Sequence, residues 1–269
     1  MTTHVKKITE RASGIAGSMS RLMPRIGGPR QSRRRLLATV VRSVVLYAAP
    51  AWEDALKHKK YVNMLRTIER KMSISVTSAY RTTATDAAGA LAGCPPYDLL
   101  AWERAENWRT KGLCKEQTRA KILDRWQDRW MGYGGWARTF IADVRVWQKE
   151  GPETDYYATQ AIVGHGSFGT YLKEIRRREN DECWFGCEVP DTPAHTIFEC
   201  PKFDEVRRQA KDKVGKEVTE GNVAEMLVRS EDSGLAVMEM LREIMKIKER
   251  GEYKWEATRE GGHNPPSSG

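Results

Sequence analysis

Three cysteines and one histidine near residue 190 are the side chains in this sequence best suited to chemistry. Cys183, Cys187, His195 and Cys200 follow the spacing C-x3-C-x7-H-x4-C within eighteen residues. Three thiolates and an imidazole from two short segments are the ligand set of a closed tetrahedral zinc site, and Gly186 allows a tight turn between the first two cysteines. We therefore predict one bound Zn²⁺. The alternative is a set of reduced, buried cysteines beside an unrelated histidine, because free cysteine packs well as a small apolar residue.

The predicted zinc site is structural, because the protein supplies all four ligands and leaves no position for water. No nucleophile elbow, P-loop, H-E-x-x-H motif or EF-hand loop occurs in the sequence, and no two aspartates are adjacent. The paired acids with which many polymerases hold two metal ions are therefore missing in their usual form. We predict no catalytic residue.

The segment Gly164–Gly169 matches the nucleotide-binding pattern G-x-G-x-x-G. That pattern binds a dinucleotide only between a strand and a helix of a βαβ unit, and almost nothing before it has the pattern of a strand. The sequence favours a glycine turn ahead of a short helix, Thr170 to Arg178.

Positive charge is concentrated at one end of the chain. The net charge is +9, and residues 1–60 hold thirteen Lys and Arg residues against three acids. This asymmetry indicates a polyanionic partner, most plausibly nucleic acid, although a solvated basic surface is the alternative. Three arginines, Arg33 to Arg35, lie in the first turn of a predicted helix, where the helix dipole disfavours cations. We predict nucleic-acid contacts from six residues of this region: Arg21, Arg25, Arg30, Arg33, Arg34 and Arg35.

The five cysteines occur without a secretory signal or an apolar run long enough for a membrane span. This usage is typical of a reducing compartment rather than of a disulfide framework. We expect an intracellular protein of the nucleus or cytoplasm, not secreted and not bound to a membrane.

Hydrophobic periodicity predicts a mainly α fold. Residues 1–28 suggest an irregular or partly helical arm that ends at Gly27-Gly28-Pro29. The expected helices run from Ser32, as N-cap, to Pro50, from Ala51 to Ser73, over Ala87–Ala92, over 97–131 in one or two pieces, around Phe140–Trp147, and over Pro201–Lys213, Val223–Arg229 and 235–249. The tail, Gly261 to Gly269, is rich in Gly, Pro and Ser and is expected to be disordered.

Four tryptophans mark the segment 97–131: Trp102, Trp108, Trp126 and Trp130. Trp126 and Trp130 share a helix face because they are four residues apart. Tryptophans can stack on the bases of single-stranded nucleic acid, but at helical spacing we favour packing in the core.

Several short segments, taken in order, resemble non-LTR (LINE-type, jockey-like) retrotransposon reverse transcriptases. They are Arg21-Leu22-Met23-Pro24, Arg34-Arg35-Leu36-Leu37, Val44–Trp52, Ala79-Tyr80-Arg81-Thr82, Leu91–Pro96, Glu103-Arg104, Asp155–Gln160, Gly164-His165-Gly166, Tyr171-Leu172 and Ala194–Pro201. The last of them resembles the terminal zinc knuckle of that family. Together the segments cover roughly residues 15–250.

The resemblance implies the C-terminal region of such an enzyme: a helical thumb and linker, a small zinc-knuckle subdomain and C-terminal helices. We place a basic arm and thumb-like helices in 1–92, a Trp-rich helical linker in 93–152, the zinc-knuckle region in 153–216, C-terminal helices in 217–260 and the tail in 261–269. The family's polymerase signature, which ends in two aspartates, has no match here. The resemblance therefore implies a chain that does not polymerise DNA, from a truncated or misannotated element.

The implied partners are RNA or an RNA/DNA hybrid of the element, with its target DNA as a further candidate. Nothing in the sequence indicates an oligomeric state. The alternative function is a zinc-stapled helical protein-interaction module that does not bind nucleic acid. Its partner would dock on an apolar helix face such as that of residues 235–249.

Overall fold

The protein is a helical assembly without β-strands over the part that the structure describes. A computed structural model describes residues 2–260, with side chains from 4 to 253. Within these residues the extended pairing is a single isolated antiparallel bridge between Glu182 and Pro190. The predicted mainly α fold is confirmed.

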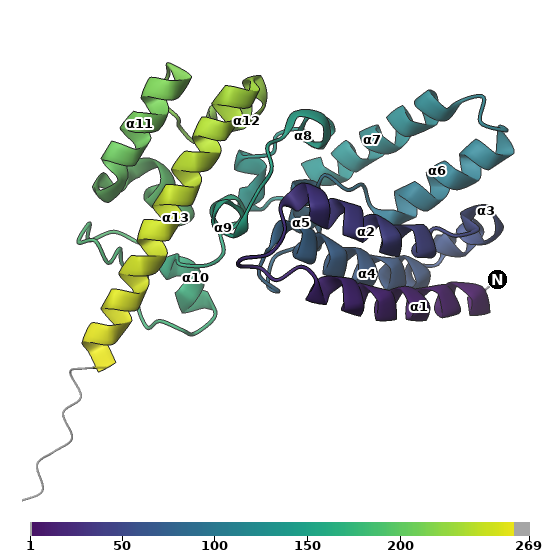
Figure 1. Cartoon of the computed structure of the whole chain (residues 1–269), viewed down its shortest axis with the longest axis horizontal. Helices are drawn as coiled ribbons and strands as arrows, with labels where there is room; N and C mark the ends of the chain where they lie inside the picture. The colour runs from purple at the N-terminus through teal and green to yellow at the C-terminus, as the bar shows by residue number, and fades with distance from the viewer. Residues whose placement is uncertain (1, 261–269) are drawn as a thin grey trace, which may run out of the picture.

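The N-terminal half is a group of packed helices, on the right in Figure 1. Its elements are α1 (Thr2–Arg21), α2 (Gln31–Val45), α3 (Ala49–Trp52), a 3-10 segment (Glu53–Lys57), α4 (Lys59–Thr77), α5 (Thr85–Ala92), α6 (Tyr97–Arg109) and α7 (Lys115–Met131). Helices α1, α2 and α4 pack against one another, and α6 and α7 form a hairpin that projects from them.

The C-terminal half is built around its last long helix. Its elements are a 3-10 turn (Trp136–Thr139), α8 (Val144–Glu150), α9 (Tyr156–Val163), α10 (Gly169–Glu174), a π-helical turn (His195–Glu199), a 3-10 turn (Pro201–Phe203), α11 (Asp204–Val214), α12 (Val223–Arg229) and α13 (Glu231–Glu260). Helix α13 packs against α9, α11 and α12, and Figure 1 shows it running the length of this half.

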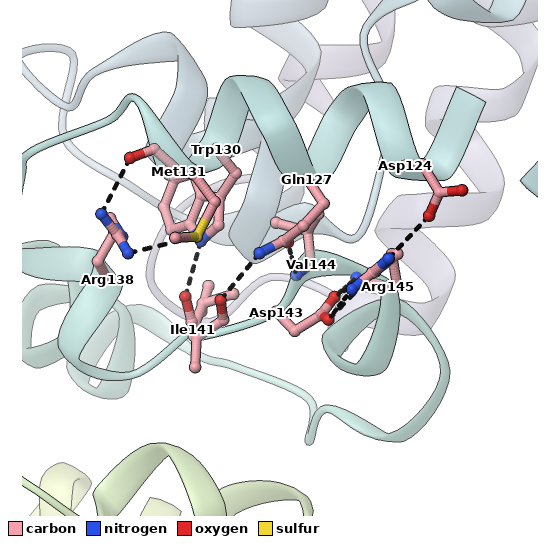
Figure 2. Close-up of polar contacts among 10 residues, drawn as sticks. Asp124, Gln127, Trp130, Met131, Arg138, Ile141, Asp143, Val144 and Arg145 are labelled. Carbon is pink, nitrogen blue, oxygen red and sulfur yellow. Dashed lines mark hydrogen bonds and ion pairs between the residues drawn. The ribbon is translucent and has the colours of Figure 1, made fainter. Parts of the chain in front are cut away.

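The connection between α7 and α8 is fixed by side chains that bond its backbone (Figure 2). The buried indole of Trp130 donates to the carbonyl oxygen of Ile141 at 2.7 Å. Gln127 brackets the start of α8, because its amide donates to Ala142 O and its carbonyl accepts from Val144 N. Helix α7 ends at Met131, which is the predicted bound, and these contacts hold the turn that follows it.

The arm predicted for residues 1–28, irregular or partly helical, is helical over most of its length. Helix α1 occupies most of it, and its buried face carries Val5, Ile8, Ala12 and Ala16. These residues recur every three or four positions, which is the helical period, but two of them are alanines and weaken the pattern. The break itself lies where it was predicted, since Gly27 adopts a positive φ of 70°.

Three features of the helices in the N-terminal half differ from those predicted. Ser32 is not the N-cap of α2, because Arg30 takes that position without a side-chain cap. Pro50 does not end α2, which stops at Val45. Instead it lies in the first turn of the short helix α3, where a missing N–H costs nothing. The helix predicted from Ala51 to Ser73 is divided at His58, whose backbone is extended.

The alternative function named the apolar face of residues 235–249 as an example of a docking site, and this face is not available to a partner. Val237, Met238, Leu241, Ile244 and Met245 are all buried within the fold. They pack beneath α9, α11 and α12, so the face is already covered. The predicted tail, 261–269, lies outside the described residues.

No single helix in the described chain has both the length and the apolarity of a membrane span. The bent pair formed by α2 and Ala49–Lys57, with 47° between its arms, meets the criterion by length and composition alone.

Candidate metal centre and nucleic-acid interface

The first two cysteines lie in a loop that follows α10. Gly186 adopts a φ of 83°, and its N–H donates to Cys183 O at 3.2 Å, which closes the predicted tight turn. Cys183 N–H also donates to Val189 O at 2.9 Å. The turn therefore directs both thiols, Cys183 and Cys187, to one side of the loop.

The other two residues of the cluster lie at the ends of one π-helical turn. Cys200 N–H donates to His195 O at 2.7 Å, five residues back along the chain. This wider turn is rare in proteins and is found mostly at functional sites. It brings His195 and Cys200 to the same side, facing the cysteine loop.

The four side chains come together as a compact cluster. Their ligand atoms all lie within 4.8 Å of one another, with Cys200 Sγ 3.9 Å from Cys183 Sγ and 3.6 Å from Cys187 Sγ. A tetrahedral ion with Zn–S bonds of about 2.3 Å requires sulfur–sulfur separations of about 3.8 Å. A disulfide requires about 2.05 Å, and all five cysteines are free. The geometry matches a metal site and excludes a disulfide.

His195 has a ring nitrogen suited to bind a metal ion. Its Nε2 is buried and has no hydrogen-bond partner among the described residues. Its Nδ1 lies 3.7 Å from Glu199 Oε2. A buried, unpartnered nitrogen is costly to desolvate unless it accepts from a donor or binds a metal.

Burial makes the thiols reluctant to ionise alone. It raises the pKa of the Cys183 thiol and raises the pKa of Cys200 to about 12. A bound cation offsets this by stabilising thiolate directly. Three soft sulfur ligands and an imidazole in tetrahedral reach are the donors that zinc accepts well.

Sequence reasoning missed a buried ion pair beneath the cluster. Lys248 of α13 and Asp191 of the cysteine loop are both completely buried, and their side chains form an ion pair. Asp191 also accepts hydrogen bonds from Thr196 Oγ1 and Gly169 N–H, each at 2.7 Å. The ammonium lies over the indole of Trp184, 3.6 Å from the ring centre. Lys248 follows Ile244 by four residues and so lies on the buried apolar face of α13. This position in the sequence could have indicated a buried lysine.

The six arginines predicted to contact nucleic acid divide into two groups. Arg21, Arg25, Arg30 and Arg33 are exposed. Arg34 is buried, and its guanidinium donates to the backbone carbonyls of Met23, Pro24, Pro29 and Ser75. Arg35 Nε donates to Ala92 O at 2.9 Å. Arg34 is therefore wrong as a phosphate contact, because its donors hold the chain between α1 and α2 against α4.

A groove separates the exposed arginines from the C-terminal half. It has a volume of about 1150 Å³ and is lined by the elbow (residues 25–31, between α1 and α2), by residues 150–157 and by parts of α12 and α13. Arg25 and Arg30 line it and form no ion pair with any described residue. The Arg25 guanidinium lies 5.5 Å from the ring centre of Tyr80. On the far side, Arg242 is paired with Asp155.

The tryptophans follow the prediction except for one. Trp126 and Trp130 are buried in the core, as predicted. Trp102 is half-buried beneath the guanidinium of Arg125, 4.4 Å from its ring centre. Trp108, near the end of α6, is 70% exposed.

Comparison with known proteins finds relatives in type-1 retrotransposable elements. A 115 kDa protein in element R1DM of Drosophila melanogaster is 25% identical over 233 residues, which cover 76% of this chain and 22% of that protein. A retrovirus-related Pol polyprotein from element R1 4 of Nasonia vitripennis is 28% identical over 255 residues, 84% of this chain and 64% of the relative. A Pol polyprotein from element R1 of Popillia japonica is 29% identical over 112 residues, 41% of this chain and 45% of the relative.

The chain spans about a fifth of the first relative and just under two thirds of the second. No protein-family model and no solved structure matches it. The homology to retrotransposon polyproteins confirms the resemblance found in the sequence.

Proposed function

We propose that this chain, whose homologues are Pol polyproteins of R1 retrotransposable elements, binds nucleic acid, and that one structural Zn²⁺ stabilises its C-terminal half. The expected ligand is structured RNA or an RNA/DNA hybrid. The observation that carries the proposal is the row of unpaired, exposed arginines at the elbow, on the rim of a groove between the two halves. Homology to retrotransposon proteins supports a nucleic-acid partner in general.

The elbow is suited to a phosphate backbone for two physical reasons. Arg34 anchors it through four backbone carbonyls, so the neighbouring arginines are presented from a fixed segment. Arg25, Arg30 and Arg33 have no carboxylate partner among the described residues, which leaves their guanidinium groups free for phosphate oxygens. Guanidinium groups bind such oxygens through paired N–H donors.

The zinc ion would be held by Cys183, Cys187, His195 and Cys200. Once bound, it would cross-link two segments that share little regular structure. The surrounding side chains make contacts that do not depend on the ion. Asp191 accepts a hydrogen bond from Thr196, next to His195, and Lys248 pairs with Asp191 and so places a positive charge beneath the cysteine loop. A closed site of this kind stabilises the fold and performs no catalysis.

The proposal is tested by titrating a fluorescent RNA hairpin and an RNA/DNA hybrid with the protein between 50 and 200 mM salt. We expect affinity to fall steeply with salt, because phosphate contacts release counterions. Replacing Arg25, Arg30 and Arg33 with alanine should weaken binding by roughly tenfold or more and flatten the salt slope by about two to three, since each lost contact removes about 0.7 to 0.9.

The matched control replaces three exposed cations of the C-terminal half, Arg208, Lys211 and Lys216, and so removes the same charge. Its effect on affinity and slope should be clearly smaller. Equal losses in both triple variants, or wild-type binding that is insensitive to salt, would contradict the proposal.

A further inference from the structure

A small polar cavity lies where α2, α6 and α7 meet, away from the elbow and the metal centre. Its volume is about 260 Å³, and three arginines line it, one from each helix: Arg42, Arg104 and Arg119. Glu103 and Gln148 complete its polar lining. None of these residues belongs to the sites described above.

The charges in this cavity are not balanced. Arg119 Nε lies 2.9 Å from Glu103 Oε1, which accounts for one cation. Arg42 and Arg104 have no carboxylate partner in the described chain. Burial, followed by the nearby charge of Arg42, lowers the pKa of Arg104. Arg42 is half-buried, whereas Arg104 and Arg119 are exposed at the rim of the cavity. Like charges held close together repel each other, and an anion between them offsets this repulsion.

Backbone and side-chain contacts hold these arginines and leave donors free. Arg104 Nη1 donates to Leu46 O, at the end of α2, at 2.9 Å. Arg42 Nη1 lies 3.8 Å from Cys94 Sγ, which is a weak acceptor. Each guanidinium carries five N–H donors, so most remain available. Two to three arginine forks around one small cavity are suited to a tetrahedral anion.

An exposed aromatic ring lies one helical turn along α6 from Arg104. Trp108 follows Arg104 by four residues on α6, so the two side chains leave the same face of the helix. The indole is 70% exposed, although tryptophan is a costly residue to leave in water. A ring next to a phosphate site is the arrangement by which proteins hold single-stranded nucleic acid, with the base stacked and the backbone paired.

We infer that Arg42, Arg104 and Arg119 form a phosphodiester-binding pocket for an unpaired strand of nucleic acid, with a neighbouring base stacked on Trp108. The inference rests on the proposed nucleic-acid binding and adds a second contact region. The elbow contacts a structured ligand along the groove between the halves, and the arginine pocket contacts a single strand on the projecting α6–α7 hairpin.

The test uses the full chain and a fluorescein-labelled single-stranded RNA of about twelve nucleotides, a length within the site sizes of single-strand-binding domains. Arg42→Gln is the main variant, because its only described polar contact is the weak one to Cys94. It should weaken binding roughly threefold to tenfold and reduce the salt slope by about 0.7, the value of one phosphate contact on a single strand. Trp108→Ala should weaken binding roughly tenfold and leave the slope unchanged, because stacking involves no counterion.

Each variant has a matched control. Arg66→Gln is the control for Arg42→Gln. It removes one positive charge from α4, on an exposed side chain that is paired with Asp86 of α5. Leu113→Ala removes an 87% exposed apolar side chain from the same hairpin, but no aromatic ring. Both should bind the single strand like the wild type. Unchanged melting temperatures of Arg42→Gln and Trp108→Ala verify that neither variant is unfolded.

The outcomes separate this inference from the proposed function. The triple alanine variant of Arg25, Arg30 and Arg33 tests the proposed function. If it loses RNA binding while Arg42→Gln and Trp108→Ala bind single-stranded RNA as the wild type does, the arginine pocket is overturned and the proposed function stands. If Arg42→Gln binds the single strand no more weakly than Arg66→Gln does, the specific role of the arginine is overturned. If Trp108→Ala binds it no more weakly than Leu113→Ala does, the specific role of the ring is overturned. If the wild type binds no RNA, both proposals fail.

Discussion

Glu69 of α4 is a buried carboxyl group without a cationic partner. Its Oε2 accepts a hydrogen bond at 3.0 Å from Tyr97 N–H, at the start of α6. Burial raises the pKa of Glu69 to about 7 from its usual 4.5, and the nearby Asp98 adds to the rise. The hydrogen bond acts in the opposite direction but does not offset the burial. The folded protein therefore binds this proton more tightly than the unfolded chain does.

We predict that this group makes the protein less stable as pH rises. Its contribution is complete below pH 4.5, where both states are protonated, and it is lost as pH rises from about 4.5 to about 7. The total loss is on the order of 3 kcal/mol, since one pKa unit corresponds to about 1.4 kcal/mol. Glu69→Gln keeps an acceptor for Tyr97 and should remove this dependence.

Urea unfolding at pH 5 and pH 8 measures the effect. The gain in unfolding free energy of Glu69→Gln over the wild type should be small at pH 5 and largest at pH 8. The same substitution at exposed Glu220 should leave the pH dependence unchanged. If the unfolding free energies of the wild type and of Glu69→Gln differ by the same amount at pH 5 and at pH 8, Glu69 ionises normally and the prediction is contradicted.

At the scale of single residues, the clustering of three cysteines and a histidine could be predicted but the contacts of the arginines could not. The spacing of such residues is a local property of the chain, so the sequence alone indicated that Cys183, Cys187, His195 and Cys200 come together. Arg34 was assigned to a partner because it sits against the helix dipole. Its real contacts, Met23 O and Ser75 O, are separated from it by up to 41 residues. Such contacts depend on the packing of α1 against α4, which the sequence pattern does not contain.

Trp108 is the opposite case, a residue that was predicted to lie in the core but is exposed. The sequence favoured the core for Trp108, because tryptophans at helical spacing usually pack there. The helix ends one residue later, at Arg109, and α7 turns back along the other side of the hairpin. The indole is therefore left uncovered. Periodicity identifies a face of a helix but not the point at which its neighbour stops.

At the scale of elements, helix α13 and the cysteine loop are joined by one buried ion pair. Lys248 reaches Asp191 from α13, and Asp191 bonds Gly169 at the start of α10 and Thr196 in the π-helical turn. Three segments therefore meet at a single carboxylate. Removing one partner of such a pair leaves an uncompensated buried charge, which typically costs 3–5 kcal/mol.

We predict that Lys248→Met destabilises the protein by about 3 kcal/mol or more, whereas the double variant with Asp191→Asn is less destabilised than the sum of the single changes. The reason is that the second substitution removes the charge that the first leaves unpaired. Equilibrium unfolding in urea of the wild type, both single variants and the double variant gives the coupling energy. Lys246→Met, whose partner Glu243 is at the surface, is the control and should cost less than 1 kcal/mol.

Helix boundaries could be predicted well only where the pattern is strong. Helix α12 has the predicted bounds, Val223–Arg229. The bounds of helix α1 could not be predicted within the partly helical arm, because Ala12 and Ala16 lie on its buried face and small residues give a weak apolar period. The division at His58 has no breaker residue to mark it. It results from the turn that places α3 against α6, a tertiary contact.

At the scale of the whole molecule, polar contacts tie the two halves together. Tyr80 OH and Tyr156 OH are 2.8 Å apart, and Thr159 Oγ1 donates to Thr77 O at 2.6 Å. Gln31 joins the halves as well, because it accepts from Thr154 N–H and donates to Leu91 O. The N-terminal half has a helical core of its own, but residues 175–194 contain no helix and little regular pairing. We therefore expect the C-terminal half to depend more strongly than the N-terminal half on the cluster of Cys183, Cys187, His195 and Cys200.

We predict that the purified chain contains one Zn²⁺, and that removing it loosens residues 175–203 while the N-terminal helices stay folded. Structural zinc contributes about 10–16 kcal/mol in small peptides, and here its effect should concentrate in the loop it cross-links. Elemental analysis gives the zinc content. Hydrogen exchange with and without a chelator should show lost protection at 175–203 and along α13 near Lys248, but unchanged protection in α4 and α5.

Single replacements identify the ligands. Each ligand is replaced in turn, with serine at Cys183, Cys187 or Cys200 and with alanine at His195. Each replacement should abolish stoichiometric zinc binding, because a closed structural site needs all four protein ligands. Serine at Cys94 or Cys114, which lie outside the cluster, should keep it. Zinc retained by all four ligand variants would remove the metal from this account. In that case the close approach of the thiols would have to come from packing alone, with Lys248 and Asp191 as the main link between the loop and α13.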